Sequence, residues 1–152
     1  MFSVAVMGNK KKFPILMREC WFGLNQVFRK KLENLPITTV QYTVLRTIYE
    51  SWPQNLNQQE IAHSITTQKN NLTPIIKRLA ELNYIEFKSN PCDKREKKIL
   101  INEMGKRIYR QANALAMSLQ SDLFSNFTEE DRHSIVDYLK RCNSQMEETV
   151  GK

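Results

Sequence analysis

The sequence predicts a mainly α-helical protein that carries one small β-hairpin. Over most of the chain, apolar residues recur at steps of three and four, which is the spacing of helices with one apolar face. Only 4 of the 152 residues are glycine and 5 are proline, which disfavours a many-stranded architecture. With 41% hydrophobic residues, the chain can bury a core of ordinary size, as one domain or as two small lobes that share a core.

Three helices are predicted in the first part of the chain. The segment 13–32 has an apolar face at helical spacing. Thr38 and Gln41 have the spacing of a capping box, so a second helix is expected to begin there. Asn57 and Glu60 repeat that spacing and predict a short third helix.

A fourth helix is predicted over 70–82, because its apolar residues form one stripe: Leu72, Ile75, Ile76, Leu79 and Leu82. No acidic residue occurs from Thr66 to Ala80, so the opposite face is basic. Pro74 fits only near the start of this helix; further inside, it removes one hydrogen bond and bends the helix. Asn83 is expected to end the helix in the left-handed conformation.

A β-hairpin and two long helices complete the prediction. Residues 84–88 and 98–101 are expected to form strands joined by a polar, basic loop. Asn102 can cap a fifth helix, and Thr128 begins a sixth with an acidic first turn. The tail after Met146 is expected to fray.

Composition and motifs exclude several classes of protein. The 23 Lys and Arg against 16 Asp and Glu give a net charge of +7, which favours a polyanionic partner such as nucleic acid. No apolar run reaches the roughly 18 to 20 residues of a membrane span, and no signal peptide is recognised, so we expect a cytoplasmic protein without membrane association. The three cysteines are far apart and predict neither disulfides nor a metal site. No catalytic or phosphate-binding motif occurs, so neither an enzyme nor a cofactor is expected.

Short helices followed by a basic hairpin are the parts of a winged helix-turn-helix. Five segments, in this order and spacing, resemble the MarR family of bacterial transcription regulators: Thr39-Val-Gln-Tyr-Thr-Val-Leu45, Gln59-Glu-Ile-Ala62, Asn71-Leu-Thr-Pro-Ile-Ile-Lys-Arg-Leu79, Asp93-Lys-Arg95 and Ile101-Asn-Glu-Met-Gly105. The resemblance covers roughly Leu24 to Val136. The form of residues 72–79 is especially similar to the branch of the family that senses organic hydroperoxides through a cysteine.

The resemblance implies an obligate homodimer that presents two winged domains to a pseudo-palindromic DNA operator. A single MarR-like domain would then occupy residues 1–152, with dimerisation helices over 13–35 and 103–148 and a DNA-binding lobe over 38–102. The two recognition helices would lie about one turn of DNA, roughly 34 to 36 Å, apart. We therefore expect a sequence-specific, double-stranded-DNA-binding transcriptional regulator, a repressor that a small-molecule ligand or an oxidant releases.

The DNA-binding candidates lie on the fourth helix and the hairpin. Asn70 and Asn71 can offer paired donors and acceptors to adenine, and Thr73 can contact a thymine methyl group. Arg95 resembles the family's wing arginine, which enters the minor groove, where Asp93 would hold its guanidinium. The whole set is Gln68, Lys69, Asn70, Asn71, Thr73, Lys77, Arg78, Lys88, Asp93, Lys94, Arg95 and Lys97, with Lys98 as a further phosphate contact.

These assignments have structural alternatives. Lys77 and Arg78 also fit the solvated face of an amphipathic helix. Asp93 fits a turn former beside a surface arginine, and Asn71 fits a helix cap. A winged-helix module that binds a protein instead of DNA is an alternative of another class, but the basic fourth helix argues against it.

Two release mechanisms remain open. Cys20 lies broadly where hydroperoxide-sensing relatives carry their reactive thiol, although this segment reads Cys20-Trp-Phe-Gly-Leu24 where theirs reads Cys-Phe-x-Leu-Tyr; an inert buried thiol is the alternative. The other mechanism is a small aromatic or amphipathic effector between the dimer helices and the winged lobe, as in many family members. The candidate pocket residues are Trp21, Tyr42, Tyr49, Trp52 and Tyr109, for which ordinary core packing is the alternative.

Overall fold

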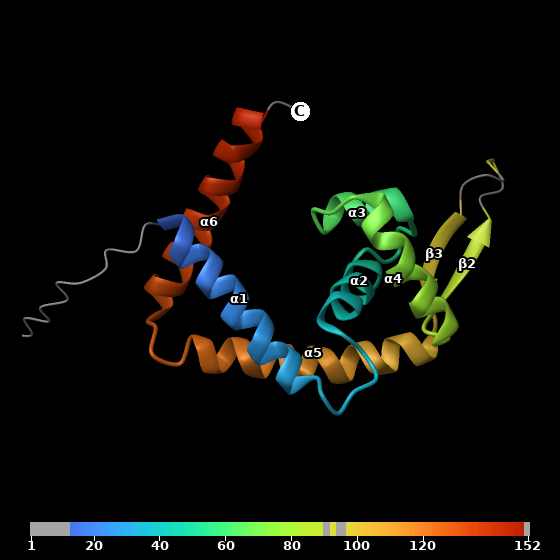
Figure 1. Ribbon diagram of the computed structural model, residues 1–152, viewed down its shortest axis with the longest axis horizontal. Coiled ribbons are helices and arrows are strands. Elements are labelled where there is room, and N and C mark those ends of the chain that lie inside the picture. The colour runs from blue at the N-terminus through green and yellow to red at the C-terminus, as the bar shows by residue number, and fades with distance from the viewer. Residues whose placement is uncertain (1–12, 90–91, 94–96, 151–152) are drawn as a thin grey trace, which may run out of the picture. The chain divides into compact units, whose positions relative to one another are not determined.

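The computed structural model describes residues 13–89, 92–93 and 97–150, and it has the predicted mainly helical fold with a small sheet (Figure 1). The elements in chain order are α1 (Phe13–Lys31), α2 (Thr39–Glu50), β1 (Leu56–Asn57), α3 (Gln58–Ser64), α4 (Lys69–Glu81), β2 (Ile85–Ser89), β3 (Lys97–Ile101), α5 (Glu103–Leu123) and α6 (Glu129–Val150). The chain divides into two compact units, residues 1–116 and 117–152. Within the described residues, no helix combines the length and the hydropathy that a membrane span requires.

Reciprocal hydrogen bonds explain where two of the helices begin. At the start of α2, Thr38 Oγ1 accepts from the backbone N–H of Gln41 at 3.2 Å, and Gln41 Oε1 accepts from the N–H of Thr38 at 2.9 Å. Asn57 and Glu60 make the same pair of bonds, of 2.9 and 2.6 Å, at the start of α3. Both predicted capping boxes are therefore confirmed.

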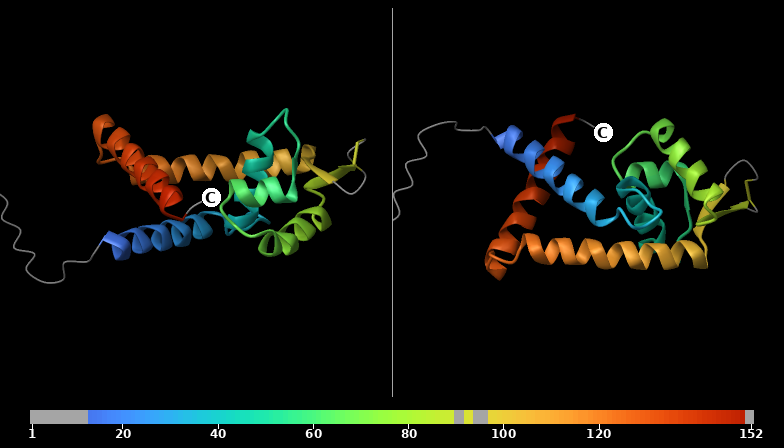
Figure 2. Two further views of the ribbon diagram at one scale, coloured as in Figure 1. Left: turned by 90° about the horizontal axis from the view of Figure 1, so that it is seen from above. Right: turned by 60° about the horizontal axis from the view of Figure 1, so that its bottom comes forward.

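The core of the first unit lies where α2, α3, α4 and the sheet meet. In both views of Figure 2, the β2–β3 hairpin lies beside α4 at the N-terminal end of α5. The largest fully buried side chains come from all four parts of this core: Val44, Leu45, Ile61, Leu72, Leu79 and Ile99. Because α4 buries this apolar stripe, its basic face is left for solvent.

The sheet has three strands, one more than the sequence predicted. Its order is β1-β3-β2, and both pairings are antiparallel. Ile99 of β3 lies opposite Leu56 of β1 on one side and opposite Phe87 of β2 on the other. Since β1 leads directly into α3, it ties the start of α3 to the hairpin.

Two residues next to α4 adopt left-handed backbone conformations. Asn83 has φ 58°, which confirms its predicted role at the end of the helix. Thr66, in the turn between α3 and α4, has φ 55°, which the sequence did not reveal. Pro74 lies inside α4 rather than in its first turn, so it removes the hydrogen bond to the carbonyl of Asn70.

The start of α5 is pressed against the end of the hairpin at Gly105. A Cβ atom at this position would overlap the carbonyl oxygen of Tyr84 and lie 2.8 Å from Cγ1 of Ile101. The backbone N–H of Gly105 donates to Asn102 Oδ1 at 2.9 Å, so Asn102 caps α5 as predicted. Only glycine allows this close approach.

The second unit contains α6, which begins at the predicted Thr128 cap. Thr128 Oγ1 accepts from the backbone N–H of Asp131 at 3.1 Å, and Asp131 Oδ2 accepts from the Thr128 hydroxyl and N–H at 2.8 and 2.9 Å. The helix continues to Val150, so the prediction of a frayed tail after Met146 is wrong. None of the residues of α6, all of which the structure describes, is buried.

Candidate nucleic-acid interface

The polar face of α4 is open to solvent. Leu72, Ile76 and Leu79 are buried against the core, which fixes the orientation of the helix. The predicted contact residues of this segment are all exposed: Gln68, Lys69, Asn70, Asn71, Thr73, Lys77 and Arg78. The helix therefore presents cations and amides together, on one rigid surface.

Asn71 is not the cap of α4. The helix begins at Lys69, the N-cap position is Gln68, and the backbone N–H of Asn71 donates to the carbonyl of Gln68 at 3.0 Å. The Gln68 side chain makes no capping hydrogen bond. The alternative interpretation of Asn71 as a helix cap is therefore wrong, because the helix starts earlier than the sequence suggested.

Gln58, the first residue of α3, bonds to the first turn of α4. Its Nε2 atom donates to Thr73 Oγ1 at 2.6 Å and to the carbonyl oxygen of Lys69 at 3.1 Å. The Thr73 hydroxyl in turn donates to the same carbonyl at 3.1 Å. Sequence reasoning missed Gln58, because no helical or strand spacing relates residues that tertiary packing alone brings together.

The hairpin adds exposed charge near its tip. Lys88 and Lys97 are exposed, as is Asp93, and Lys97 Nζ lies 5.9 Å from the ring centroid of Phe87. The predicted contacts Lys94 and Arg95 lie outside the described residues.

Lys98 differs from the other hairpin lysines. Its Nζ atom lies 3.1 Å from Glu60 Oε2, and its side chain is only 25% exposed. The same Glu60 oxygen accepts the backbone N–H of Asn57 in the α3 capping box. Lys98 thus links β3 to the start of α3, in addition to the phosphate contact that the sequence suggested for it.

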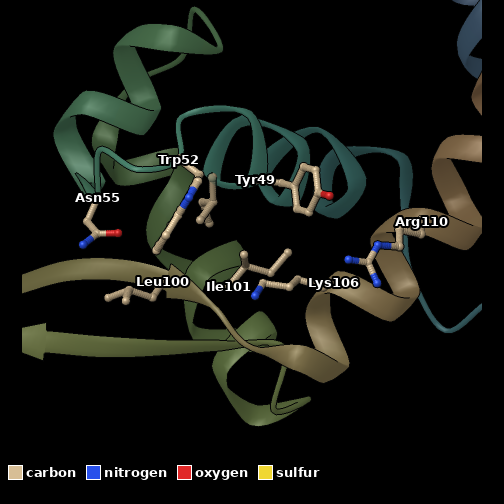
Figure 3. Close-up of a pocket in the computed structure, with 8 residues that line it drawn as sticks. Tyr49, Trp52, Asn55, Leu100, Ile101, Lys106 and Arg110 are labelled. Carbon is tan, nitrogen blue, oxygen red and sulfur yellow. The ribbon is translucent and has the colours of Figure 1, made fainter.

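A cavity of about 330 Å³ lies within the first unit (Figure 3). Its wall is formed by Ile48, Tyr49, Trp52, Asn55, Leu100, Ile101, Lys106 and Arg110. Figure 3 shows Tyr49 of α2 on one side and the cationic side chains of Lys106 and Arg110 of α5 on the other. Lys106 Nζ is 2.7 Å from Glu103 Oε1, and this contact lowers the pKa of Glu103. An apolar and aromatic wall thus faces two cations.

The other predicted pocket residues lie elsewhere. The rings of Tyr42 and Tyr109 are buried and stacked with centroids 6.0 Å apart, and the Tyr42 hydroxyl donates to Asn113 Oδ1 at 2.9 Å. Burial raises the pKa of both tyrosines. These two rings belong to the core, and Trp21 is exposed on α1.

Cys20 and Cys92 are exposed and Cys142 is half-buried, and none of the three is in a disulfide. In the part of the chain that the structure describes, no three His, Cys, Asp or Glu side chains gather as metal ligands would. In the single chain, Cys20 is thus exposed on α1.

Comparisons with known proteins find a family-model match and similar transcriptional regulators. The model of the MarR family matches residues 37–97. The HTH-type transcriptional regulator SarZ of Staphylococcus epidermidis is 25% identical over 122 residues, 80% of this chain and 80% of its own length. The S. aureus MepR–DNA complex has a TM-score of 0.84 at 20% identity, covering 91% of this chain and 99% of that chain. CouR from Rhodococcus jostii RHA1, bound to p-coumaroyl-CoA, has a TM-score of 0.77 at 19% identity, covering 86% and 90%.

The structural neighbours establish the fold over most of the chain, and the family model identifies its central part. Residues 37–97 thus match the MarR family model, and the relatives that are similar over most of the chain are named HTH-type transcriptional regulators.

Proposed function

We propose that this protein binds double-stranded DNA sequence-specifically, as a homodimer at a pseudo-palindromic operator, and represses transcription until a small-molecule ligand releases it. The observation that supports this function best is the exposed face of α4, with Lys69, Lys77 and Arg78 and no acidic residue from 66 to 80. A helix of about 10 to 12 Å diameter fits the major groove of B-DNA. The MepR neighbour, which was solved with DNA, agrees with the proposal.

The first turn of α4 would read bases. The amides of Asn70 and Asn71 are exposed, and an amide can offer adenine a donor and an acceptor at once. Lys69 would reach guanine or a phosphate, and the neighbouring Gln68 would contact the DNA from the N-cap position.

Phosphate contacts would come from further along α4 and from the hairpin. Arg78 pairs with Glu81 at 3.3 Å, but both side chains are about half exposed, so the pair contributes little and a phosphate can replace the carboxylate. Lys77 is exposed beside it. The hairpin would add Lys88, Asp93, Lys94, Arg95 and Lys97.

Salt dependence tests the DNA-binding proposal. We expect the slope of log K against log[salt] to be several negative units for a mixed-sequence duplex, because phosphate contacts release counterions. Lys77→Ala should weaken binding to all duplexes alike and reduce the slope by about one unit. Lys140→Ala, on α6, is the matched control and should leave the slope unchanged. A wild-type affinity that does not change with salt would contradict the proposal.

The apolar residues of α1 and α6 support dimerisation. Trp21 and Phe22 of α1 are 68% and 63% exposed, and Tyr138 and Met146 of α6 are 60% and 53% exposed. In these two helices, which the structure describes in full, no residue of α6 is buried and Phe28 is the one buried residue of α1, so the apolar faces of both helices gain stability chiefly when they meet another surface. A second copy of this chain supplies that surface in the proposed dimer.

The cavity supports control by an effector. Its aromatic wall, Tyr49 and Trp52, and its cations, Lys106 and Arg110, suit a small aromatic or amphipathic anion. CouR, one of the structural neighbours, was solved with p-coumaroyl-CoA. In the proposed mechanism, a ligand favours a dimer whose recognition helices no longer match the spacing of the DNA groove.

Trp52 fluorescence tests the effector site. In a Trp21→Phe variant, Trp52 is the remaining tryptophan, and we expect benzoate to change its emission and to release DNA, with benzamide as the uncharged control. Arg110→Ala should weaken the benzoate response several-fold, since one of the two cations is lost. An equal response to both compounds would exclude an anion site.

Peroxide treatment tests the alternative mechanism, in which oxidation of Cys20 releases the protein from DNA. If Cys20 is the sensor, Cys20→Ser should stay on DNA after peroxide treatment while Cys92→Ser, the matched exposed thiol, is released. Release of the Cys20→Ser protein would exclude this mechanism.

A further inference from the structure

We propose that Gln58 of α3 is a positioning residue that makes the recognition helix selective for thymine, by fixing the side chain of Thr73. The inference rests on the proposed DNA binding by α4. Gln58 is half-buried between the two helices, whereas Thr73 is exposed on the face that would enter the groove. Gln58 therefore acts through Thr73, without being required at the DNA itself.

The Thr73 hydroxyl forms its hydrogen bonds within the protein. A threonine hydroxyl has one hydrogen and two lone pairs. The hydrogen is donated to the carbonyl oxygen of Lys69 at 3.1 Å, and one lone pair accepts Gln58 Nε2 at 2.6 Å. The Thr73 methyl group, which has no polar requirement, is then the group best suited to meet the C5-methyl group of thymine.

Gln58 selects between the side-chain conformations of Thr73. A threonine in a helix occupies two rotamers, one of which lets Oγ1 bond the carbonyl four residues earlier. The Nε2 atom of Gln58 donates both to Oγ1 and to that same carbonyl, of Lys69, so it stabilises this rotamer in particular. Without Gln58, the hydroxyl is free to turn toward the DNA, where it can bond to bases of either kind.

Gln58 also forms a hydrogen bond at the very start of α4. Gln68, the N-cap residue, provides no capping hydrogen bond from its side chain. Gln58, on the neighbouring helix, donates to the carbonyl oxygen of Lys69, the first residue of the helix. The same side chain thus holds both the first turn of α4 and the rotamer of Thr73.

The test compares the affinity of the protein for duplexes with thymine or uracil at one position, because the two bases differ only in the C5-methyl group. The duplex that wild-type protein enriches most from a random-sequence pool is the probe, and each thymine is replaced by uracil in turn. We expect one position in each half-site at which uracil weakens wild-type binding about fourfold, the worth of one buried methyl group. Gln58→Leu should reduce that ratio to less than twofold, while the control Gln59→Leu, at an exposed neighbour, keeps it.

A double variant separates positioning from general damage to α4. Valine at position 73 carries methyl groups at both γ positions, so Gln58→Leu combined with Thr73→Val should regain the fourfold ratio. A merely structural role of Gln58 predicts no such rescue. Thr73→Ser, which keeps Gln58 and the hydroxyl but lacks the methyl group, should lose the ratio, and a full ratio in this variant would overturn the inference even if Gln58→Leu does not fold.

Three results would overturn the inference: a full uracil penalty in Gln58→Leu, a full penalty in Thr73→Ser, or no penalty in the wild-type protein. Enrichment of no sequence from the pool would instead refute the proposed DNA-binding function.

Discussion

Thr66 holds a left-handed backbone conformation that costs a residue with a Cβ atom about 1 to 2 kcal/mol. Thr66→Gly removes this cost, although glycine also gives the unfolded chain more freedom. We expect a net gain of about 0.5 kcal/mol in the free energy of unfolding, measured by urea denaturation. The control Ser64→Gly, at the last residue of α3, where the backbone is not left-handed, should lower it by about the same amount.

At Gly105, we expect a small substitution to have the opposite effect on the free energy of unfolding. Gly105→Ala would force a methyl group onto the carbonyl oxygen of Tyr84, so we expect a loss of about 3 kcal/mol in the free energy of unfolding. Gly23→Ala, in α1, is the matched control: its Cβ would meet no atom within 4 Å, and the change should be neutral or stabilising. Equal effects at both positions would contradict the close approach.

At the level of single residues, the sequence predicted what depends on near neighbours. Thr38 and Asn57 were identified as caps because each bonds a residue three positions on. The partners of Gln58 and Lys98, in contrast, lie 15 and 38 residues away, so no local pattern relates them. Their roles follow only from the packing of α3 against α4 and β3.

At the scale of an element, the N-terminus of α6 predicts a pH effect. Hydrogen bonds from the Thr128 hydroxyl and backbone N–H lower the pKa of Asp131 below its ordinary value of 3.8. Because the pKa of Asp131 is lower in the folded state, these bonds fully stabilise the helix start at pH values above the pKa of the unfolded chain. The stabilisation is lost as the pH falls through the folded pKa.

Thr128→Val removes the hydroxyl bond, so the pKa of Asp131 should rise toward its ordinary value in an NMR titration of the side-chain carboxyl. Thr149→Val, which removes a hydroxyl bonded to the carbonyl of Gln145, should leave the pKa of Asp131 unchanged. A pKa of Asp131 that is the same in all three proteins would refute the assignment.

Element types were predicted more reliably than their details. The stripe of Leu72, Ile76 and Leu79 gave α4 within one residue at each end, because helical periodicity is strong over such a length. The strand β1 was missed because two residues cannot show an alternating pattern. Tyr42 and Tyr109 were assigned to a pocket because an aromatic residue at helical spacing fits a core and a cavity wall equally well.

At the scale of the whole molecule, the proposed dimer predicts a change in molecular mass. Trp21→Glu places a charge on the exposed apolar face of α1, so we expect sedimentation of a monomer and at least a tenfold loss of operator affinity, since a dimer binds two half-sites at once. Trp52→Glu, at the other tryptophan, which is 74% exposed outside the helices, should remain dimeric. Monomeric wild-type protein at micromolar concentration would contradict the dimer.

One carboxylate, that of Glu60, serves two parts of the first unit, since it closes the start of α3 and holds Lys98 of β3. Since Gln58 also bonds α3 to α4, the helix and the hairpin that would contact the DNA are both joined to α3. The helix and the hairpin of one lobe would then bind to an operator, or leave it, together. A lobe with only one of the two bound would be rare. In the proposed function, repression by such a lobe would have two states, bound and released, with few intermediates between them.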